Sequence, residues 1–212
     1  MTAHAKLRDE IVRTGASLFN RGLTHGSTGN ISIRLDDGGW LMTPTGSSLG
    51  MLDPARLSLL DADGRHFDGD KPTKEAFLHT TMYRERPTAG AVVHLHSTYS
   101  VAVSCLDHAD CHDVLPPITA YSVMRVGTLP LVPYYPPGDE SLADAVGKLA
   151  GKHHAVLLAN HGPVVAGTTL AAATDAVEEL EETARLFLLL RNERIRMLTP
   201  DQVAELKRRF PT

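Results

Sequence analysis

Residues 91–105 read "AVVHLHSTYSVAVSC", and two histidines, His94 and His96, stand at the end of the apolar run. This β-branched run predicts a buried strand, and the residues from Ser100 onward could begin a helix. Because residues i and i+2 of a strand point to the same face, both imidazoles should project together while Leu95 faces the core. Two such imidazoles can bind one divalent ion, but they can equally be two histidines with ordinary hydrogen bonds. The stretch alone leaves both interpretations open.

A second apolar run, "AVLLAN" at residues 155–160, predicts another buried strand, and His161 follows it directly. Gly162-Pro163 then predicts a tight turn. The histidine could simply cap backbone groups in that turn, but the end of a strand also suits a third metal ligand. Three histidines leave a fourth coordination position for water or substrate, which is typical of catalytic rather than structural zinc sites.

A candidate carboxylate, Glu75, lies in "DKPTKEAFLH" at residues 70–79. A helix is predicted over residues 73–86, so Glu75 should lie near its N-terminus, where the helix dipole favours the ionised form. Most glutamates in a first turn only stabilise their helix, and that alternative stays open. His79 follows four residues later, but no HExxH motif is present. We therefore expect His79 to pack in the core or to support the site.

Two loops rich in glycine, serine and threonine, at residues 24–34 and 43–50, lie beside predicted strands. Their backbone N–H groups and hydroxyls can form a cradle for an oxyanion such as phosphate. Each loop alone could also be an ordinary turn. The sequence contains neither a Walker A motif nor GxGxxG, so it gives no support for nucleotide binding.

The order of the predicted elements indicates a single layered α/β domain over residues 1–212, with a mixed sheet. Residues 107–138, rich in proline, are expected to be largely irregular. Helices are expected at residues 5–21, 140–151, 169–198 and 199–210, and further strands at residues 30–35, 40–44, 57–69 (with a turn) and 131–134.

Composition excludes some classes of partner. The 212 residues carry a formal net charge of −4, so no overall basic field would attract nucleic acid. No apolar run approaches the roughly 20 residues of a membrane span, and the charged N-terminal stretch lacks an apolar signal core. Two cysteines form no disulfide framework. The sequence therefore predicts a cytoplasmic protein that binds neither membranes nor nucleic acid.

Five short motifs occur in a specific order along nearly the whole chain: STGNIS (27–32), TPTG (43–46), PTKE (72–75), HLHS (94–97) and NHG (160–162). Together they resemble the class II aldolase/adducin family, in its sugar-phosphate aldolase branch. The resemblance implies a three-layer α/β/α fold with a central mixed, largely antiparallel sheet. It implies that Zn²⁺ or another divalent metal is held by His94, His96 and His161. Glu75 would be the acid/base beside the metal and could also ligate it.

The resemblance also implies a phosphate site. The residues that fall at the family's phosphate-binding positions are Gly29, Asn30, Thr45, Gly46, Thr73 and Lys74. Lys74 departs from the fuculose- and rhamnulose-type aldolases, which have serine or glycine there, and adds a positive charge for a dianion. The segments PTKEAFLH, SCL and LTPDQVAELKRRFP look more like the 3-oxo-tetronate 4-phosphate decarboxylases of the family.

The implied activity is decarboxylation of a small phosphorylated sugar acid to dihydroxyacetone phosphate and CO2, through a metal-stabilised enediolate. The alternatives are a fuculose-phosphate-type aldolase, a 4-epimerase, a methylthioribulose-phosphate dehydratase, and an adducin-like interaction module without enzymatic activity. The intact histidines and glutamate argue against the last. The resemblance further implies a homo-oligomer, most simply a tetramer. Tyr121 and the predicted helix at 170–198 are candidates for its interface, although a long apolar helix is more often plain core.

Overall fold

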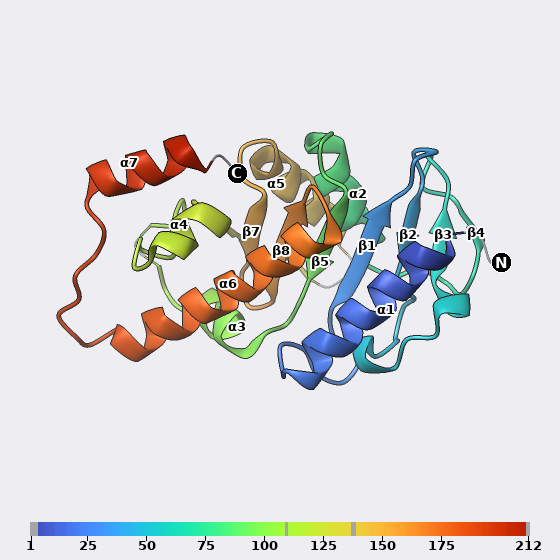
Figure 1. The fold of residues 1–212 in the computed structure, drawn as a ribbon, viewed down its shortest axis with the longest axis horizontal. Helices are drawn as coiled ribbons and strands as arrows, with labels where there is room; N and C mark the ends of the chain where they lie inside the picture. The colour runs from blue at the N-terminus through green and yellow to red at the C-terminus, as the bar shows by residue number, and fades with distance from the viewer. Residues whose placement is uncertain (1–3, 109, 137–138, 211–212) are drawn as a thin grey trace.

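An eight-stranded β-sheet forms the centre of the computed structural model, which describes residues 4–108, 110–136 and 139–210 (Figure 1). The strands are β1 (Asn30–Arg34), β2 (Trp40–Met42), β3 (Ser58–Leu60), β4 (His66–Asp68), β5 (Ala91–His94), β6 (Leu131–Val132), β7 (Ala155–Leu158) and β8 (Gly162–Gly167). Their order across the sheet is β4-β3-β2-β1-β5-β8-β7-β6. Neighbouring strands among these eight run antiparallel, apart from the parallel pair of β6 and β7. The prediction of a mixed, largely antiparallel sheet is confirmed.

Helices cover both faces of this sheet, which confirms the predicted three layers (Figure 1). One face packs against α1 (Ala5–Asn20), α3 (Thr98–Ser104) and α6 (Leu170–Leu190), and the other against α2 (Ala76–Glu85) and α5 (Ser141–Ala150). The remaining helical segments are α4 (Ala120–Arg125), α7 (Pro200–Arg209) and the 3-10 helices η1 (Leu49–Met51) and η2 (Pro54–Arg56). Across the described residues, no helix is long and apolar enough to cross a membrane.

Strand β5 lies in the middle of the sheet, and its alternating side chains divide between two hydrophobic clusters. Val93 and Leu95 belong to the cluster that includes α1 and α6, whereas Val92 belongs to the cluster that includes α2 and α5. Because side chains alternate along a strand, His94 points to the same face as Val92, the face that α2 covers. Its Cα partner on β1 is Asn30. The fold thus brings the start of α2 and the start of β1 to the end of β5.

The helix predicted over residues 169–198 is wrong in its last part, because α6 ends at Leu190. The first part has a buried face that packs on β5 and β8. Residues 191–198 are mostly polar and exposed, so they lack the apolar face from which a protein helix draws its stability. The chain leaves the helix, and the N–H of Leu198 donates to the carbonyl of Pro117 at 3.0 Å.

The tight turn predicted at Gly162-Pro163 is also wrong, because Gly162 begins β8, which pairs with both β5 and β7. The turn lies just before it at Asn160, whose φ of 55° is in the left-handed region that asparagine tolerates. The sequence pattern does not predict β8 because this strand opens with glycine and proline, which usually weaken a strand. The segment 107–138, predicted to be largely irregular, contains the short helix α4, which Thr119 caps.

Candidate metal centre

His94 is the last residue of β5, and its side chain is fully buried. His96 follows just outside the strand and is half-buried. As the sequence predicted, the two rings point toward one another, with 3.0 Å between their Nε2 atoms. The other ring nitrogen of His94, Nδ1, lies 2.8 Å from the carbonyl oxygen of Pro163 at the start of β8. Strand pairing therefore fixes the orientation of the His94 ring.

His161 enters the same place from the turn between β7 and β8. The left-handed residue Asn160 reverses the chain just before it. The N–H of His161 donates to the carbonyl of Leu158 at 3.1 Å, so the turn itself holds the backbone of the histidine. Its Nε2 atom lies 3.0 Å from Nε2 of His96.

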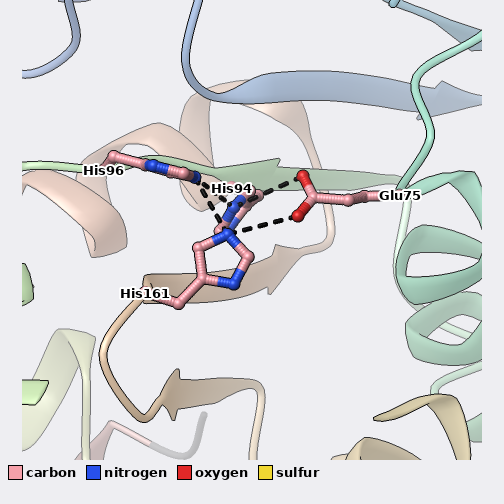
Figure 2. Close-up of side chains that lie close together, drawn as sticks. All are labelled: Glu75, His94, His96 and His161. Atoms are coloured by element: carbon pink, nitrogen blue, oxygen red, sulfur yellow. Dashed lines mark hydrogen bonds and ion pairs between the residues drawn. The ribbon is translucent and has the colours of Figure 1, made fainter. Parts of the chain in front are cut away.

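Glu75 completes the group from the N-cap position of α2, and its side chain is 18% exposed. Its Oε1 lies 3.2 Å from Nε2 of His161, and its Oε2 lies 3.5 Å from Nε2 of His94 (Figure 2). One potential ligand atom from each of Glu75, His94, His96 and His161 lies within 4.8 Å of all the others. The structure thus brings together the four residues that the sequence pointed to, and they form a possible metal site.

The hydrogen-bond partners of the rings show that this group suits a cation. Nδ1 of His94 faces a carbonyl oxygen, which only accepts, so Nδ1 carries the hydrogen and the neutral ring presents a lone pair at Nε2. That lone pair faces a carboxylate oxygen of Glu75, which is also an acceptor. Nε2 of His96 lies at 3.0 Å from two other imidazole nitrogens, and a single hydrogen could serve only one of them. A divalent ion satisfies such converging acceptors, and a carbonyl-held Nδ1–H is a common support for a metal-binding histidine.

The protonation states of the four side chains also favour binding of a metal ion. Burial alone would raise the pKa of Glu75, but its hydrogen bonds with His161 and Asn30 favour the ionised form and help to hold that pKa below its usual range. Burial lowers the pKa of His94. Burial, with His94 and His161 nearby, lowers the pKa of His96 to about 3. Neutral imidazoles and an ionised carboxylate are the forms that bind metal.

The loops that carry the predicted phosphate residues lie side by side next to this centre. The N–H of Thr45 donates to the carbonyl of Lys71 at 2.9 Å, and the N–H of Thr73 donates to the carbonyl of Thr43 at 3.2 Å. The hydroxyl of Thr43 in turn accepts from the N–H of Ile31 on β1. Gly46 and Lys74 are exposed on these loops. The structure therefore gathers Gly29, Asn30, Thr45, Gly46, Thr73 and Lys74 onto adjoining segments.

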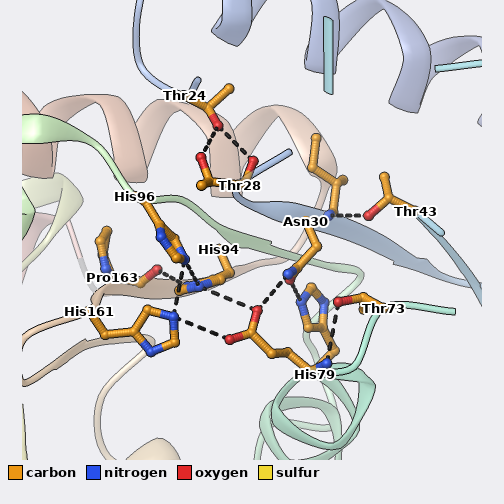
Figure 3. A network of polar contacts seen from close by, with 12 residues as sticks. Thr24, Thr28, Asn30, Thr43, Thr73, His79, His94, His96, His161 and Pro163 are labelled. Atoms are coloured by element: carbon orange, nitrogen blue, oxygen red, sulfur yellow. Dashed lines mark hydrogen bonds and ion pairs between the residues drawn. The ribbon is translucent and has the colours of Figure 1, made fainter. Parts of the chain in front are cut away.

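The side chain of Asn30 is engaged differently from the phosphate role that the family resemblance implies. Its Nδ2 donates to Oε2 of Glu75 at 2.7 Å, and its Oδ1 lies beside Nε2 of His79 (Figure 3). His79 is fully buried, and burial lowers its pKa to about 3. The expectation that His79 packs in the core or supports the site agrees with this contact.

A cavity of about 600 Å³ opens beside the histidines. The side chains that line it include His25, Tyr134, Tyr135 and Asn160, together with His96 and His161. The sequence analysis singled out none of the first four as site residues. The only signal for His25 was its place in the glycine-rich loop 24–34, and nothing in the sequence linked the two tyrosines to the histidines. Tyr121, the predicted interface residue, lies on α4 and is 60% exposed.

Fold and centre together define a three-layer α/β/α protein with a carboxylate and three histidines converging at the end of a central strand. The chain belongs to the family described as Class II Aldolase and Adducin N-terminal domain, whose pattern matches residues 9–188. The resemblance drawn from the five motifs is thereby confirmed.

Individual relatives are similar over almost their whole length. The chain is 52% identical over 206 residues to a 3-oxo-tetronate 4-phosphate decarboxylase of Pectobacterium atrosepticum, covering 97% of this chain and 94% of the relative. It is 31% identical over 211 residues to L-fuculose phosphate aldolase of Escherichia coli K12, covering 98% and 95%. The crystal structure of YgbL from Escherichia coli matches with a TM-score of 0.94 and 51% identity, covering 96% of this chain and 98% of that one.

Proposed function

We propose that this chain is a divalent-metal-dependent carbon–carbon lyase that decarboxylates a 3-oxo-tetronate 4-phosphate to dihydroxyacetone phosphate and CO2. The observation that carries the proposal is the convergence, within 4.8 Å, of ligand atoms from Glu75, His94, His96 and His161. The choice of reaction is supported by 52% identity to a relative named for it, against 31% to L-fuculose phosphate aldolase.

The proposed ion is Zn²⁺, held by His94, His96 and His161, with Glu75 as a further ligand when no substrate is bound. Three imidazole nitrogens and a carboxylate oxygen are a donor set that suits zinc. When bound, such an ion supplies positive charge that stabilises the negative charge developing on a substrate oxygen as the carbon–carbon bond breaks.

Glu75 is proposed as the group that delivers the proton. In the decarboxylation, the bond between the carboxylate carbon and its neighbour breaks, CO2 leaves, and the electron pair moves toward the adjacent carbonyl oxygen. The neighbouring carbon must then gain one proton to give dihydroxyacetone phosphate. Because Glu75 is held in its ionised form, it must first take up that proton from water.

The substrate phosphate is proposed to lie over the two adjoining loops that start at Thr43 and at Pro72. These loops pair through an isolated bridge between Pro44 and Pro72, which keeps them adjacent. Lys74 is exposed and would provide the positive charge for the phosphate dianion. The other proposed contacts are Gly29, Thr45, Gly46 and Thr73, whereas the side chain of Asn30, also expected there, is engaged with Glu75 and His79.

A second candidate function is aldol cleavage of a ketose 1-phosphate. It is supported by the similarity to L-fuculose phosphate aldolase over 98% of this chain. The same four residues would serve it, since negative charge develops on a substrate oxygen in both reactions. The two candidates differ only in the group that leaves, which is an aldehyde in one and CO2 in the other.

We also propose that the chain forms a single cytoplasmic domain that assembles as a homo-oligomer, most simply a tetramer. Tyr121 on α4 and Leu189 near the end of α6 are 60% and 65% exposed, and such large side chains suit a contact between copies. Mass measurement by light scattering tests the assembly. A monomer at micromolar concentration would refute it.

A substrate panel tests the reaction. We expect release of CO2 from 3-oxo-tetronate 4-phosphates and little aldehyde release from ketose 1-phosphates. The opposite ranking would favour the aldolase, and no turnover of either class would contradict both.

Metal content tests the centre independently of the reaction. Purified protein should carry about one divalent ion per chain, as four converging ligands predict, and His94→Ala should abolish binding. Glu75→Gln should still bind metal but lose turnover. An empty site in wild-type protein prepared without chelators, or near-normal turnover by Glu75→Gln, would contradict the assigned roles.

A further inference from the structure

A chain of hydrogen bonds leads from the core on the α2 side of the sheet to Glu75. The hydroxyl of Tyr83 lies 2.8 Å from Oγ of Ser32, which lies 2.6 Å from Nδ1 of His79. Nε2 of the same ring lies 2.5 Å from Oδ1 of Asn30, whose Nδ2 donates to Glu75 at 2.7 Å. The first four side chains belong to residues that are at most 5% exposed. Figure 3 shows the last part of this chain, where His79 and Asn30 lie against one another.

The direction of every hydrogen bond follows from the carboxylate at the end. Glu75 only accepts, so Nδ2 of Asn30 faces it and Oδ1 faces the histidine. Oδ1 also only accepts, so Nε2 of His79 must carry a hydrogen. Among the described residues, no carboxylate contacts this buried ring at either nitrogen, so it is neutral and its Nδ1 accepts from Ser32. Ser32 has then used its only hydrogen, and Tyr83 must donate to it.

We propose that His79 is a positioning residue for Glu75, acting through Asn30. Its Nε2–H holds the amide of Asn30 so that an N–H faces the carboxylate and fixes Oε2. The other oxygen, Oε1, remains on the side of His161. The other His79 tautomer would present a lone pair to Oδ1 and favour the flipped amide. That amide would turn an acceptor against the carboxylate and displace it.

Ser32 supports this tautomer, because its hydroxyl donates to the lone pair of Nδ1. Without that hydroxyl, the buried Nε2–H form loses one of its two ring hydrogen bonds, and the ring is held less firmly against Asn30. A purely structural role of Ser32 and His79 would predict that loss of any buried hydroxyl in this sheet lowers stability and leaves Glu75 in place.

A direct test is the ¹⁵N spectrum of the His79 ring in wild-type protein, which distinguishes the two neutral tautomers from each other and from imidazolium. We expect hydrogen on Nε2 only. Hydrogen on Nδ1, or on both nitrogens, would overturn the proposal without any variant or substrate.

A matched pair of variants tests the consequence. Ser32→Ala should lower zinc affinity, measured against a competing chelator, by about tenfold, and should lower kcat by about 10- to 100-fold with KM little changed. Ser58→Ala is the control, because Ser58 is also a fully buried strand serine but donates to the carbonyl of Asp70. It should lower stability alone. Equal effects of the two variants on zinc affinity would refute the role of His79.

Variants of His79 itself keep the proposal testable if Ser32→Ala does not fold. His79→Gln keeps a donor toward Asn30 and should retain at least about tenfold more zinc affinity than His79→Leu. Equal losses would contradict the proposal. The kinetic arm rests on the proposed function, whereas the tautomer and the zinc competition do not. Absence of turnover in the substrate assay alone would therefore contradict the proposed reaction and not the proposed role of His79.

Discussion

Replacing Gly29 with alanine should damage stability and the metal centre together. Gly29 lies immediately before Asn30 and has a φ of 80°, in the left-handed region that favours glycine. An added Cβ would lie 2.9 Å from the carbonyl oxygen of His94 and 3.2 Å from Cδ2 of Leu95. The carbonyl belongs to the central strand β5, which cannot move without shifting a proposed metal ligand.

The expected magnitude has two parts. Left-handed backbone at a residue with a Cβ costs about 1–2 kcal/mol. Forcing an extra carbon into a packed region costs about 1–3 kcal/mol more. The sum for Gly29→Ala is about 2–5 kcal/mol. Gly22 provides the control, because its φ is 75° but an added Cβ would meet nothing within 4 Å among the described residues. Gly22→Ala should cost only about 1–2 kcal/mol.

Urea unfolding measures the difference in free energy of unfolding between the two variants. Zinc competition against a chelator shows whether the metal centre is affected. Gly29→Ala should lose at least about 1 kcal/mol more than Gly22→Ala, because only it adds the packing cost. It should also bind zinc more weakly, whereas Gly22→Ala should bind it like wild type. If the two variants lose the same free energy of unfolding and keep the same zinc affinity, the close approach to His94 has no energetic consequence and the reasoning fails.

Three further predictions concern other parts of the chain. Lys74→Ser should raise KM by roughly tenfold, because one charge-assisted contact to the substrate phosphate is lost. Its metal content should not change. An unchanged KM would show that Lys74 does not contact the phosphate. Glu181→Gln should lower the free energy of unfolding, measured in urea, by about 2 kcal/mol or more. The reason is that the buried Glu181 carboxylate accepts from the N–H groups of Tyr99 and Ser100 at 2.8 Å each. Wild-type stability of the variant would contradict this role of Glu181. Burial lowers the pKa of His154 below its ordinary value of 6.5, so the unfolded chain binds more protons there and stability should fall as pH drops below about 6.5. His154→Gln should flatten this pH dependence of stability, and an identical pH profile would show that the residue does not contribute.

The four centre residues could be predicted because local rules place each of them. The alternation expected of an extended chain puts His94, the last residue of β5, and His96, just outside it, on one side. His161 follows the end of a second apolar run. Glu75 falls at the start of a helix that its own sequence predicts. These are properties of short segments. The family's motif order then supplied what the segments could not, namely that they meet.

The supporting contacts could not be predicted, because they join distant segments through register and packing. His79 and Ser32 are 47 residues apart, and only the position of α2 over β1 makes them neighbours. The end of α6 at Leu190 is different, because the polar residues that follow it could have been read from the sequence as the loss of an apolar face. The tyrosines of the cavity come from a proline-rich segment without a periodic pattern. Their place beside His161 follows from β6 pairing with β7.

The compactness of the centre follows from backbone contact on both sides of the segment that carries His94 and His96. On one side, Gly29 lets the chain before β1 approach the carbonyl of His94. On the other, Gly162 lets the start of β8 approach the carbonyl of Leu95, where an added Cβ would lie only 2.3 Å away. Asn30 and His161 are the immediate neighbours of these two glycines. The backbone segments that carry the surrounding side chains are therefore held close to one another, which leaves no room for a Cβ at either glycine. This explains why two glycines without any ligand atom belong to motifs as specific as those of the histidines.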